Sequence, residues 1–422
     1  MALVVQKYGG SSVSDAEKIK HVAARVIKTQ AEGNQVVVVV SAMGDTTDEL
    51  IDLASSVTTD VEGNREMDVL LTAGERISMA LLAMAIRDQG VKAMSFTGFQ
   101  AGISTDSEHG SARIWKIDPK RIQEALKDGN VVVVAGFQGF SFENGDTTTL
   151  GRGGSDTTAV ALAAALKADI CEIYSDVDGV YTADPRIVPR ARKLAQIDLD
   201  SMLELSSSGA KILYIRAVEF ARRHRVPLRV RSTFSADPGT LVYTTKEGEE
   251  MEEPVVSGVA ADSTQSKITV IGVPDRPGKA AEIFQAVAEA GANIDMIVQN
   301  VSTTENGLSD ISFTLPHSDR HKVVETLKSQ QGAIGFQSVT YDDEIGKLSI
   351  VGAGMKTSSG VSAKLFGALA KAGINIEMIS TSEIRISVIT RADQLKEATR
   401  IVHTAFELDA AETAVIYAGT GR

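Results

Sequence analysis

Over residues 2–242 the chain alternates short, continuously apolar runs with longer segments of helical spacing, and this alternation restricts its fold more than any other feature. The apolar runs are residues 3–6, 36–40, 131–135 and 170–174, and the helical segments include residues 16–30, 73–88 and 119–127. A run that is apolar at every position is typical of a strand buried on both faces. Strands that alternate with helices form a parallel sheet between helix layers. We therefore predict an α/β domain with a three-layer αβα fold and a mostly parallel sheet, whose ligands bind at the carboxyl ends of the strands.

An acidic segment at residues 243–254 interrupts this pattern and ends in Pro254, which is typical of a linker. Beyond it the sequence repeats itself, because the string Gly-x-Asn-Ile follows a helical segment at both Gly291 and Gly373. Two copies of a ferredoxin-like βαββαβ unit, which can pair their sheets, explain this repeat. The predicted domains are residues 1–245, a linker at 246–262, and two α+β domains at 263–342 and 343–422.

The composition excludes several classes of partner. A net charge of -12 argues against a nucleic-acid or anionic-membrane surface, although it leaves room for locally held phosphates. No signal peptide and no run of about 18 apolar residues is visible, so we expect no membrane span. The single cysteine, Cys171, allows no internal disulfide and fits a cytoplasmic protein. Since Cys171 lies in an apolar run, we expect a buried and inert thiol.

Two glycine-containing loops are candidates for phosphate binding. The first, Lys7-Tyr8-Gly9-Gly10-Ser11, directly follows the first apolar run, and its glycines permit close approach of the backbone to a phosphate. The following helix would add free N–H groups and the positive end of its dipole. Taken alone, this string is explained about as well by an ordinary turn between a strand and a helix.

The second loop begins at Gly151 and opens a helix near residue 159. Its Arg152 can bind a carboxylate through two hydrogen bonds, whereas Asp156 can either act in the site or cap the helix. Neither loop has the spacing of a Walker A motif. Asp156 stands where the last glycine of a dinucleotide-binding Gly-x-Gly-x-x-Gly would be, so that site is disfavoured as well.

Carboxylates at two further places could bind ligands. Asp176, Asp178 and Asp184 follow the run at 170–174 and could orient a nucleotide and its Mg²⁺, although a solvated turn has the same composition. Glu75 is predicted to lie near a helix start, where it could accept hydrogen bonds from an ammonium group or merely favour the helix dipole. We expect no metal site made by a cluster of side chains, and we interpret the pair His317 and His321 as surface residues.

Together, several strings resemble those of the aspartate kinases, within the amino-acid kinase superfamily. They are Lys7-Tyr-Gly-Gly-Ser-Ser, Val40-Ser-Ala-Met-Gly-Asp-Thr-Thr, Leu71-Thr-Ala-Gly-Glu-Arg, Gly98-Phe-Gln-Ala-Gly, Thr149-Leu-Gly-Arg-Gly-Gly-Ser-Asp and Tyr174-Ser-Asp-Val-Asp-Gly-Val. The resemblance covers essentially the whole chain and is closest to the short, monofunctional actinobacterial type. Tyr8 departs from the pattern, since many relatives have Phe there.

The resemblance implies transfer of the γ-phosphoryl group of MgATP to the β-carboxylate of L-aspartate, the first step of lysine, threonine, methionine and diaminopimelate biosynthesis. It implies that the catalytic residues are Lys7, Glu75, Arg152 and Asp156. The implied ATP-binding residues are Lys7, Tyr8, Gly9, Gly10, Ser11, Tyr174, Ser175, Asp176, Val180, Tyr181, Asp184 and Lys211. The implied aspartate-binding residues are Ser41, Thr47, Glu75, Arg152, Gly153, Gly154 and Ser155.

The repeated half resembles a pair of ACT domains, which bind amino-acid effectors between paired copies. Lysine together with threonine is the effector pair that the resemblance implies. The implied effector-binding residues are Asp275, Arg276, Pro277, Gly278, Lys279, Asn293, Ile294, Asp295, Gln299, Asn375, Ile376, Thr381 and Ser382. Among them, the carboxylate of Asp295 could hold one end of a free amino acid.

Met251 comes just after Lys246-Glu-Gly-Glu-Glu, in which Lys-Glu-Gly can be encoded by a purine-rich ribosome-binding sequence at suitable spacing. We therefore hypothesise an internal start there, which would give a free regulatory subunit and an α2β2 enzyme; the alternative is a homo-oligomer. Two other functions are weighed against the main one: another carboxylate kinase such as a glutamate kinase, and an inactive amino-acid sensor. The string Thr72-Ala-Gly-Glu-Arg and the repeated half argue against the first, and the intact candidate catalytic residues argue against the second.

Overall fold

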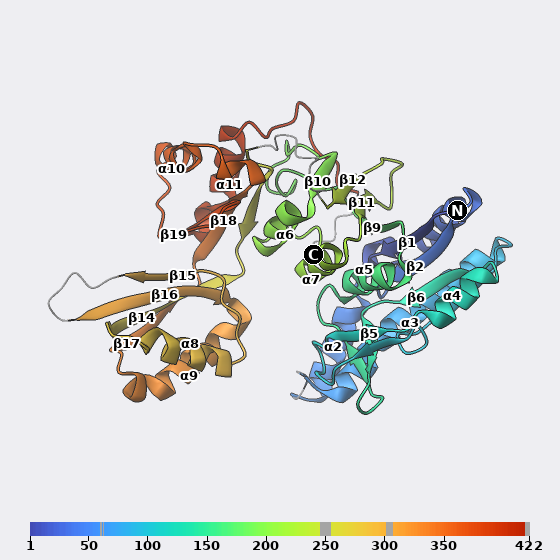
Figure 1. Ribbon diagram of the computed structural model, residues 1–422, viewed down its shortest axis with the longest axis horizontal. Coiled ribbons are helices and arrows are strands. Elements are labelled where there is room, and N and C mark those ends of the chain that lie inside the picture. Colours follow the sequence, from blue (N-terminus) through green and yellow to red (C-terminus); the bar gives the residue numbers. More distant parts are fainter. Residues whose placement is uncertain (60, 62, 245–254, 301–306, 418–422) are drawn as a thin grey trace.

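The computed structural model describes residues 1–59, 61, 63–244, 255–300 and 307–417. Met251, the hypothetical internal start, lies outside these residues. The chain forms an α/β lobe over residues 1–244 and two smaller units that contain the repeats (Figure 1). We call these the first repeat unit, residues 265–342, and the second repeat unit, residues 258–262 and 345–405.

An eight-stranded sheet forms the centre of the α/β lobe, in the order β10-β12-β11-β9-β1-β2-β6-β3. Its strands are β1 (Leu3–Tyr8), β2 (Gln35–Val40), β3 (Ala93–Phe96), β6 (Val131–Ala135), β9 (Ile170–Ser175), β10 (Gln196–Asp198), β11 (Leu228–Ser232) and β12 (Thr240–Tyr243). Neighbouring strands are parallel except β11 and β12. The predicted mostly parallel sheet is confirmed, and its carboxyl edge carries the loops after β1, β2, β6 and β9.

Helices cover both faces of this sheet, as the predicted three-layer fold requires. They are α1 (Ala16–Ala31) and α3 (Arg65–Asp88) on one face, and α4 (Lys120–Lys127), α5 (Gly154–Leu166), α6 (Leu199–Ser207) and α7 (Ile215–His224) on the other. Helix α2 (Thr46–Val57) packs on α3. A small second sheet joins β4 (Ile103–Thr105), β5 (Ile114–Ile117), β7 (Gln138–Ser141) and β8 (Thr147–Thr149).

Helix α3 is the one helix of the described residues that is long and apolar enough to cross a membrane. Half of its most apolar stretch is buried, and residues such as Leu82 and Ile86 pack against α1 and the sheet. A core helix meets the same two criteria of length and composition, so this property is weak evidence for a span.

The two repeat units have matching sheets, β15-β16-β14-β17 and β19-β20-β18-β13. The first unit has β14 (Gln265–Pro274), α8 (Lys279–Glu289), β15 (Ile297–Asn300), β16 (Leu308–Pro316), α9 (His317–Ile334) and β17 (Ser338–Asp342). The second has β13 (Gly258–Asp262), β18 (Ile345–Val351), α10 (Val361–Lys371), β19 (Met378–Thr381), β20 (Arg385–Arg391) and α11 (Leu395–Ala405). Because β13 takes the edge position that β17 occupies in the first unit, residues 258–262 are part of the second unit and not of the linker that we assigned to 246–262.

Two reciprocal ion pairs join the repeat units. Lys267 on β14 pairs with Glu377, and Lys347 on β18 pairs with Asp295, so that equivalent residues of the two repeats exchange partners. The Nζ atom of Lys347 also donates to the carbonyl oxygen of Ser207 at the end of α6, at 3.3 Å. Lys347 therefore links both units to the α/β lobe.

The end of the described chain returns to the α/β lobe. Asp409 and Ile416 form isolated antiparallel bridges to Ala191 and Val177, which lie in the loops after β9. The second repeat unit is thus tied to this lobe through both β13 and the C-terminal segment.

Candidate active site

The loops after β1 and β2 meet the N-terminus of α5 and one face of α3 around a cleft of about 950 Å³. The cleft lies at the carboxyl edge of the central sheet, where the strand pattern predicted a ligand site. Among its lining residues are all seven predicted aspartate-binding residues, namely Ser41, Thr47, Glu75, Arg152, Gly153, Gly154 and Ser155. Lys7, Gly10 and Asp156 line it as well.

Lys7 and Asp156 form a buried ion pair at the floor of the cleft. The Nζ atom of Lys7 lies 2.6 Å from Oδ1 of Asp156, and the two side chains are 2% and 1% exposed. Asp156 lies in the first turn of α5, but Gly153 is the N-cap residue and no side chain caps the helix. The interpretation of Asp156 as a helix cap is therefore wrong, and its carboxylate instead holds the lysine.

The loop after β1 is held close to the loop after β2. The N–H of Gly44 donates to the carbonyl oxygen of Gly10 at 3.1 Å. A Cβ atom on Gly10 would lie 2.8 Å from the carbonyl oxygen of Gly44, so the approach requires glycine. A 3₁₀ turn at Gly10–Ser12 follows the loop, and α1 then begins at Ala16 as predicted, where Asp15 caps it by accepting a hydrogen bond from the N–H of Lys18.

Glu75 lies in the middle of α3 rather than in the first turn that we predicted, and its side chain is 3% exposed. Its Oε1 accepts a hydrogen bond from the N–H of Ala42 at 3.1 Å. Its Oε2 is buried and has no hydrogen-bond donor among the described residues. Burial raises the pKa of the Glu75 carboxyl to about 7. The cleft thus contains a buried carboxylate oxygen that a ligand could satisfy.

Arg152 lies in the same cleft and carries the opposite charge. Its side chain is exposed, and within the described part of the chain its guanidinium makes no hydrogen bond or ion pair. The next residue, Gly153, has φ +70°, and a Cβ atom there would lie 2.0 Å from the ring of Tyr214. Only glycine fits this turn, which holds Arg152 at the cleft. The Oε2 atom of Glu75 and the guanidinium of Arg152, neither of which has a partner among the described residues, match the two charged ends of a free amino acid.

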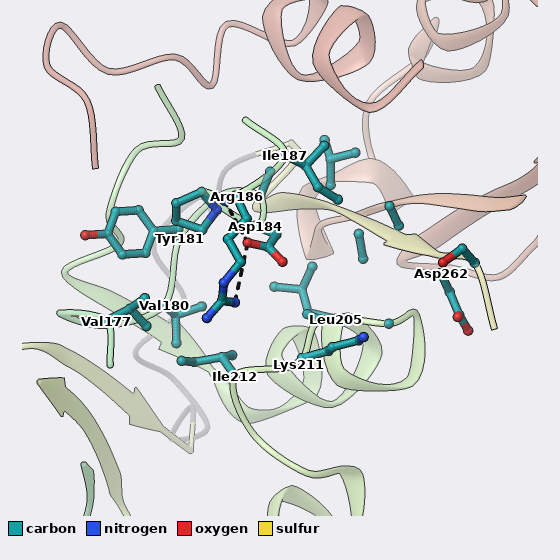
Figure 2. A pocket seen from close by; sticks show the side chains of 18 of the residues that line it. Val177, Val180, Tyr181, Asp184, Arg186, Ile187, Leu205, Lys211, Ile212 and Asp262 are labelled. Atoms are coloured by element: carbon teal, nitrogen blue, oxygen red, sulfur yellow. Dashed lines mark hydrogen bonds and ion pairs between the residues drawn. The ribbon is translucent and has the colours of Figure 1, made fainter. Parts of the chain in front are cut away.

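A second cavity of about 200 Å³ lies beyond the carboxyl end of β9, and Figure 2 shows side chains that line it. It is lined by six of the predicted ATP-binding residues: Ser175, Asp176, Val180, Tyr181, Asp184 and Lys211. Its other wall comes from the second repeat unit, including Asp262 and Leu395. Arg186, which we did not predict, pairs with Asp176 at 2.7 Å and with Asp184 at 3.8 Å. The string Asp184-Pro-Arg was the sequence signal that could have identified Arg186 as a residue of this cavity.

Two residues predicted to bind ATP, Tyr8 and Tyr174, have side chains in the protein core. Both are fully buried, and their rings stack with centroids 4.6 Å apart. The hydroxyl of Tyr174 donates to Glu172 at 2.9 Å. Neither tyrosine lines the second cavity, and their contact with a nucleotide stays a prediction.

The predicted effector-binding residues divide into exposed and internally paired ones. Residues 275–278 form an exposed turn before α8, and Asn293, Gln299, Asn375, Thr381 and Ser382 are also exposed, while Ile294 and Ile376 are half-buried. Lys279 is buried and pairs with Glu282 at 2.6 Å. Since Asp295 pairs with Lys347, its carboxylate does not stand free to hold an amino acid, contrary to our expectation.

Two other expectations concern metal ligands and the thiol. The described residues contain no group of three or more His, Cys, Asp and Glu side chains arranged to hold a metal ion. His317 is hydrogen-bonded to Ser266, and His321 lies 3.4 Å from Glu325. Cys171 is buried as predicted, and its burial raises the pKa of the thiol.

Comparisons with known proteins agree with this architecture. The amino acid kinase family matches residues 2–232, and ACT domains match residues 267–332 and 348–406. The aspartokinases of Corynebacterium efficiens and Mycobacterium tuberculosis are 58% and 56% identical to this chain over 422 residues, which cover all of both chains.

Among solved structures, an aspartate kinase from Synechocystis is 43% identical, with a TM-score of 0.53, and the match covers 96% of this chain and 70% of that one. E. coli aspartokinase III in complex with aspartate and ADP shares the fold, with a TM-score of 0.81 at 24% identity over 96% of this chain and 99% of that one. The predicted family, fold class and pair of ACT domains are confirmed. The chain therefore belongs to the amino acid kinase family and, within it, to the aspartokinases, and it is an enzyme with kinase activity.

Proposed function

We propose that this chain transfers the γ-phosphoryl group of MgATP to the β-carboxylate of L-aspartate, giving ADP and 4-phospho-L-aspartate. One observation carries the proposal. Glu75 and Arg152 present a carboxylate oxygen and a guanidinium that have no partner in the described part of the chain, in one cleft beside the Lys7–Asp156 ion pair. Glu75 accepts hydrogen bonds from the α-ammonium group of aspartate, and Arg152 binds the α-carboxylate. The β-carboxylate is then the end of the substrate left to react.

The chemistry needs positioning more than proton transfer. The β-carboxylate is ionised at neutral pH, so it attacks the γ-phosphorus without a general base while the bond to the leaving ADP oxygen breaks. Lys7 stabilises the negative charge of the transferring group, and Asp156 holds its ammonium in place at 2.6 Å. Mg²⁺ on the nucleotide phosphates supplies further charge neutralisation when bound.

The second cavity supports binding of the nucleotide next to Lys7. Strands β1 and β9 are parallel neighbours, with Lys7 paired in register to Ile173, so their carboxyl ends share one edge. Apolar side chains of Val180 and Ile212 offer walls for the base, while Lys211 offers charge for a phosphate. The γ-phosphate would then reach across the end of β1 into the aspartate cleft.

The ACT pair is proposed to bind lysine and threonine and to inhibit this reaction. Direct contacts support this proposal, because the second repeat unit supplies Asp262 and Leu395 to the proposed nucleotide cavity, and Lys347 joins both units to α6. An effector that changes the packing of the two units would alter this wall. To regulate, it must bind the active and inactive arrangements with different free energies.

Assembly as an α2β2 enzyme, with the small subunit starting at Met251, remains part of this proposal, with a homo-oligomer as the alternative. Cells that express the Met251→Leu variant should lack the small polypeptide on a gel. If the polypeptide persists, the internal start is wrong.

A hydroxamate assay with ATP and Mg²⁺ tests the activity. We expect acyl-phosphate formation with L-aspartate, little with L-glutamate, and inhibition by lysine plus threonine. Activity with glutamate alone would identify another carboxylate kinase. A well-folded chain without activity on either substrate would identify an amino-acid sensor.

A further inference from the structure

A histidine and an aspartate that sequence reasoning did not single out lie at the same cleft. Nδ1 of His109 lies 2.7 Å from Oδ2 of Asp68, and both residues line the cleft. Asp68 is 1% exposed, whereas the His109 side chain is 15% exposed. The other ring nitrogen, Nε2 of His109, has no hydrogen-bond partner in the described ranges. Asp68 thus fixes the ring at Nδ1, and Nε2 is available to a ligand.

Asp68 also fixes the loop that carries His109. Its carboxylate accepts hydrogen bonds from the N–H of Gly110, at 3.1 Å to Oδ1, and from the hydroxyl of Thr149. It therefore joins α3, the loop around residue 110 and the end of β8. Strand β8 leads directly into the turn that presents Arg152.

The two loops are also in direct contact. A Cβ atom on Gly151 would lie 3.0 Å from the carbonyl oxygen of Gly110. The residue after His109 therefore abuts the residue before Arg152, which places the histidine at the same end of the cleft as the arginine. Glu75 lies seven residues, or about two turns, beyond Asp68 on α3. The two side chains therefore lie on the same face of this helix, one at each end of the site.

We propose that His109 is a further substrate-binding residue, donating a hydrogen bond from Nε2 to the α-carboxylate of aspartate beside Arg152. This inference rests on the proposed function. Asp68 is its positioning residue, because it holds Nδ1 and so aims Nε2 at the cleft. When both ring nitrogens carry a hydrogen, one donates to Asp68 and the other to the substrate. The ring then separates the buried Asp68 carboxylate from the α-carboxylate, which would otherwise repel each other.

A purely structural role for His109 is the competing explanation, and a substrate analogue separates the two. L-Aspartate α-amide keeps the β-carboxylate and the ammonium but lacks the α-carboxylate charge. We would measure KM for aspartate, for the α-amide and for MgATP in wild type, His109→Ala and His109→Gln. The matched control is His224→Ala, a surface histidine on α7 outside the cleft.

A hydrogen bond to the charged α-carboxylate predicts that His109→Ala raises KM for aspartate about tenfold or more, with KM for MgATP unchanged within about twofold. The ratio of KM for the α-amide to KM for aspartate should shrink by about the same factor, because variant and analogue remove one shared contact. His109→Gln, which keeps an uncharged donor, should fall between wild type and His109→Ala.

A ratio equal to that of wild type in both variants would overturn the inference, since His109 would then make no contact that depends on the α-carboxylate. The ratio is internal to each variant, so it stays informative if a variant melts at a lower temperature. Wild-type turnover of aspartate tests the proposed function separately. An active wild type with an unchanged ratio refutes only the role of His109, whereas a wild type that does not phosphorylate aspartate refutes both.

Discussion

Replacing Glu75 by glutamine should stabilise the protein at neutral and alkaline pH while weakening its binding of aspartate. Burial raises the pKa of the folded carboxyl from 4.5 to about 7. At 1.36 kcal/mol per pKa unit, this difference of about 2.5 units corresponds to about 3 kcal/mol. The native state binds this proton more tightly than the unfolded chain. Wild type therefore keeps its full stability below pH 4.5 and loses about 3 kcal/mol as the pH rises to 7.

Glu75→Gln removes the charge but keeps the volume and the oxygen that accepts from the N–H of Ala42. We expect its free energy of unfolding to exceed that of wild type by about 3 kcal/mol at pH 8 and by less than about 1 kcal/mol at pH 5. For a domain of this size, the gain at pH 8 corresponds to a rise in Tm of about 6 °C or more.

Calorimetric melting of both proteins at the two pH values measures this difference in the transition of the α/β lobe. The matched control is Glu124→Gln on the exposed face of α4, which should change stability by less than about 0.5 kcal/mol at either pH. The reasoning is refuted if Glu75→Gln gives no gain at pH 8, or the same gain at both pH values.

Four further predictions concern binding and regulation. The wild-type KM for aspartate should rise about tenfold per pH unit below pH 7, because protonated Glu75 no longer accepts from the ammonium; an equal slope in Glu75→Gln would contradict this. Arg152→Ala should raise KM for aspartate by about 10- to 100-fold without changing KM for MgATP, and an unchanged value would refute its role. Gly153→Ala should weaken aspartate binding similarly, since its Cβ atom meets the Tyr214 ring; wild-type kinetics would show that the turn is not rigid. Lys347→Met should leave uninhibited activity within about twofold but reduce sensitivity to lysine plus threonine, and full inhibition in the variant would exclude this link.

The strand pattern predicted the α/β lobe well because its strands are buried on both faces. Strand β6 begins and ends where the apolar run does, at Val131 and Ala135. Helix α3 was predicted to start near residue 73, but it begins at Arg65 after the N-cap Asn64. Its first turns carry polar residues, which mask the apolar periodicity, and this error led to the wrong interpretation of Glu75 as a first-turn residue.

Side-chain direction explains which site residues were predicted correctly. Successive residues of a strand point to opposite faces, so if Lys7 on β1 faces α5, Tyr8 must face the other layer. Tyr174 is paired in register with Tyr8 and follows it into that layer. The alternation of side-chain direction along a strand therefore predicted that both tyrosine rings point into that layer. Asp68 and His109 had no such signal, because they lie 41 residues apart and only the fold brings them together.

The chain order of the repeat units explains how an event at their interface can reach the active site. The first repeat unit is an insertion between β13 and β18, two neighbouring strands of the second unit's sheet. The second unit is attached to the α/β lobe by the bridge at Ile416 and lines the proposed nucleotide cavity, whereas Lys322 on α9 of the first unit lines the aspartate cleft. The side chain of Lys347 contacts all three parts at once, through Asp295 and the carbonyl oxygen of Ser207. We thus expect a shift between the two units to change the wall of the proposed nucleotide cavity, so that inhibition raises KM for MgATP.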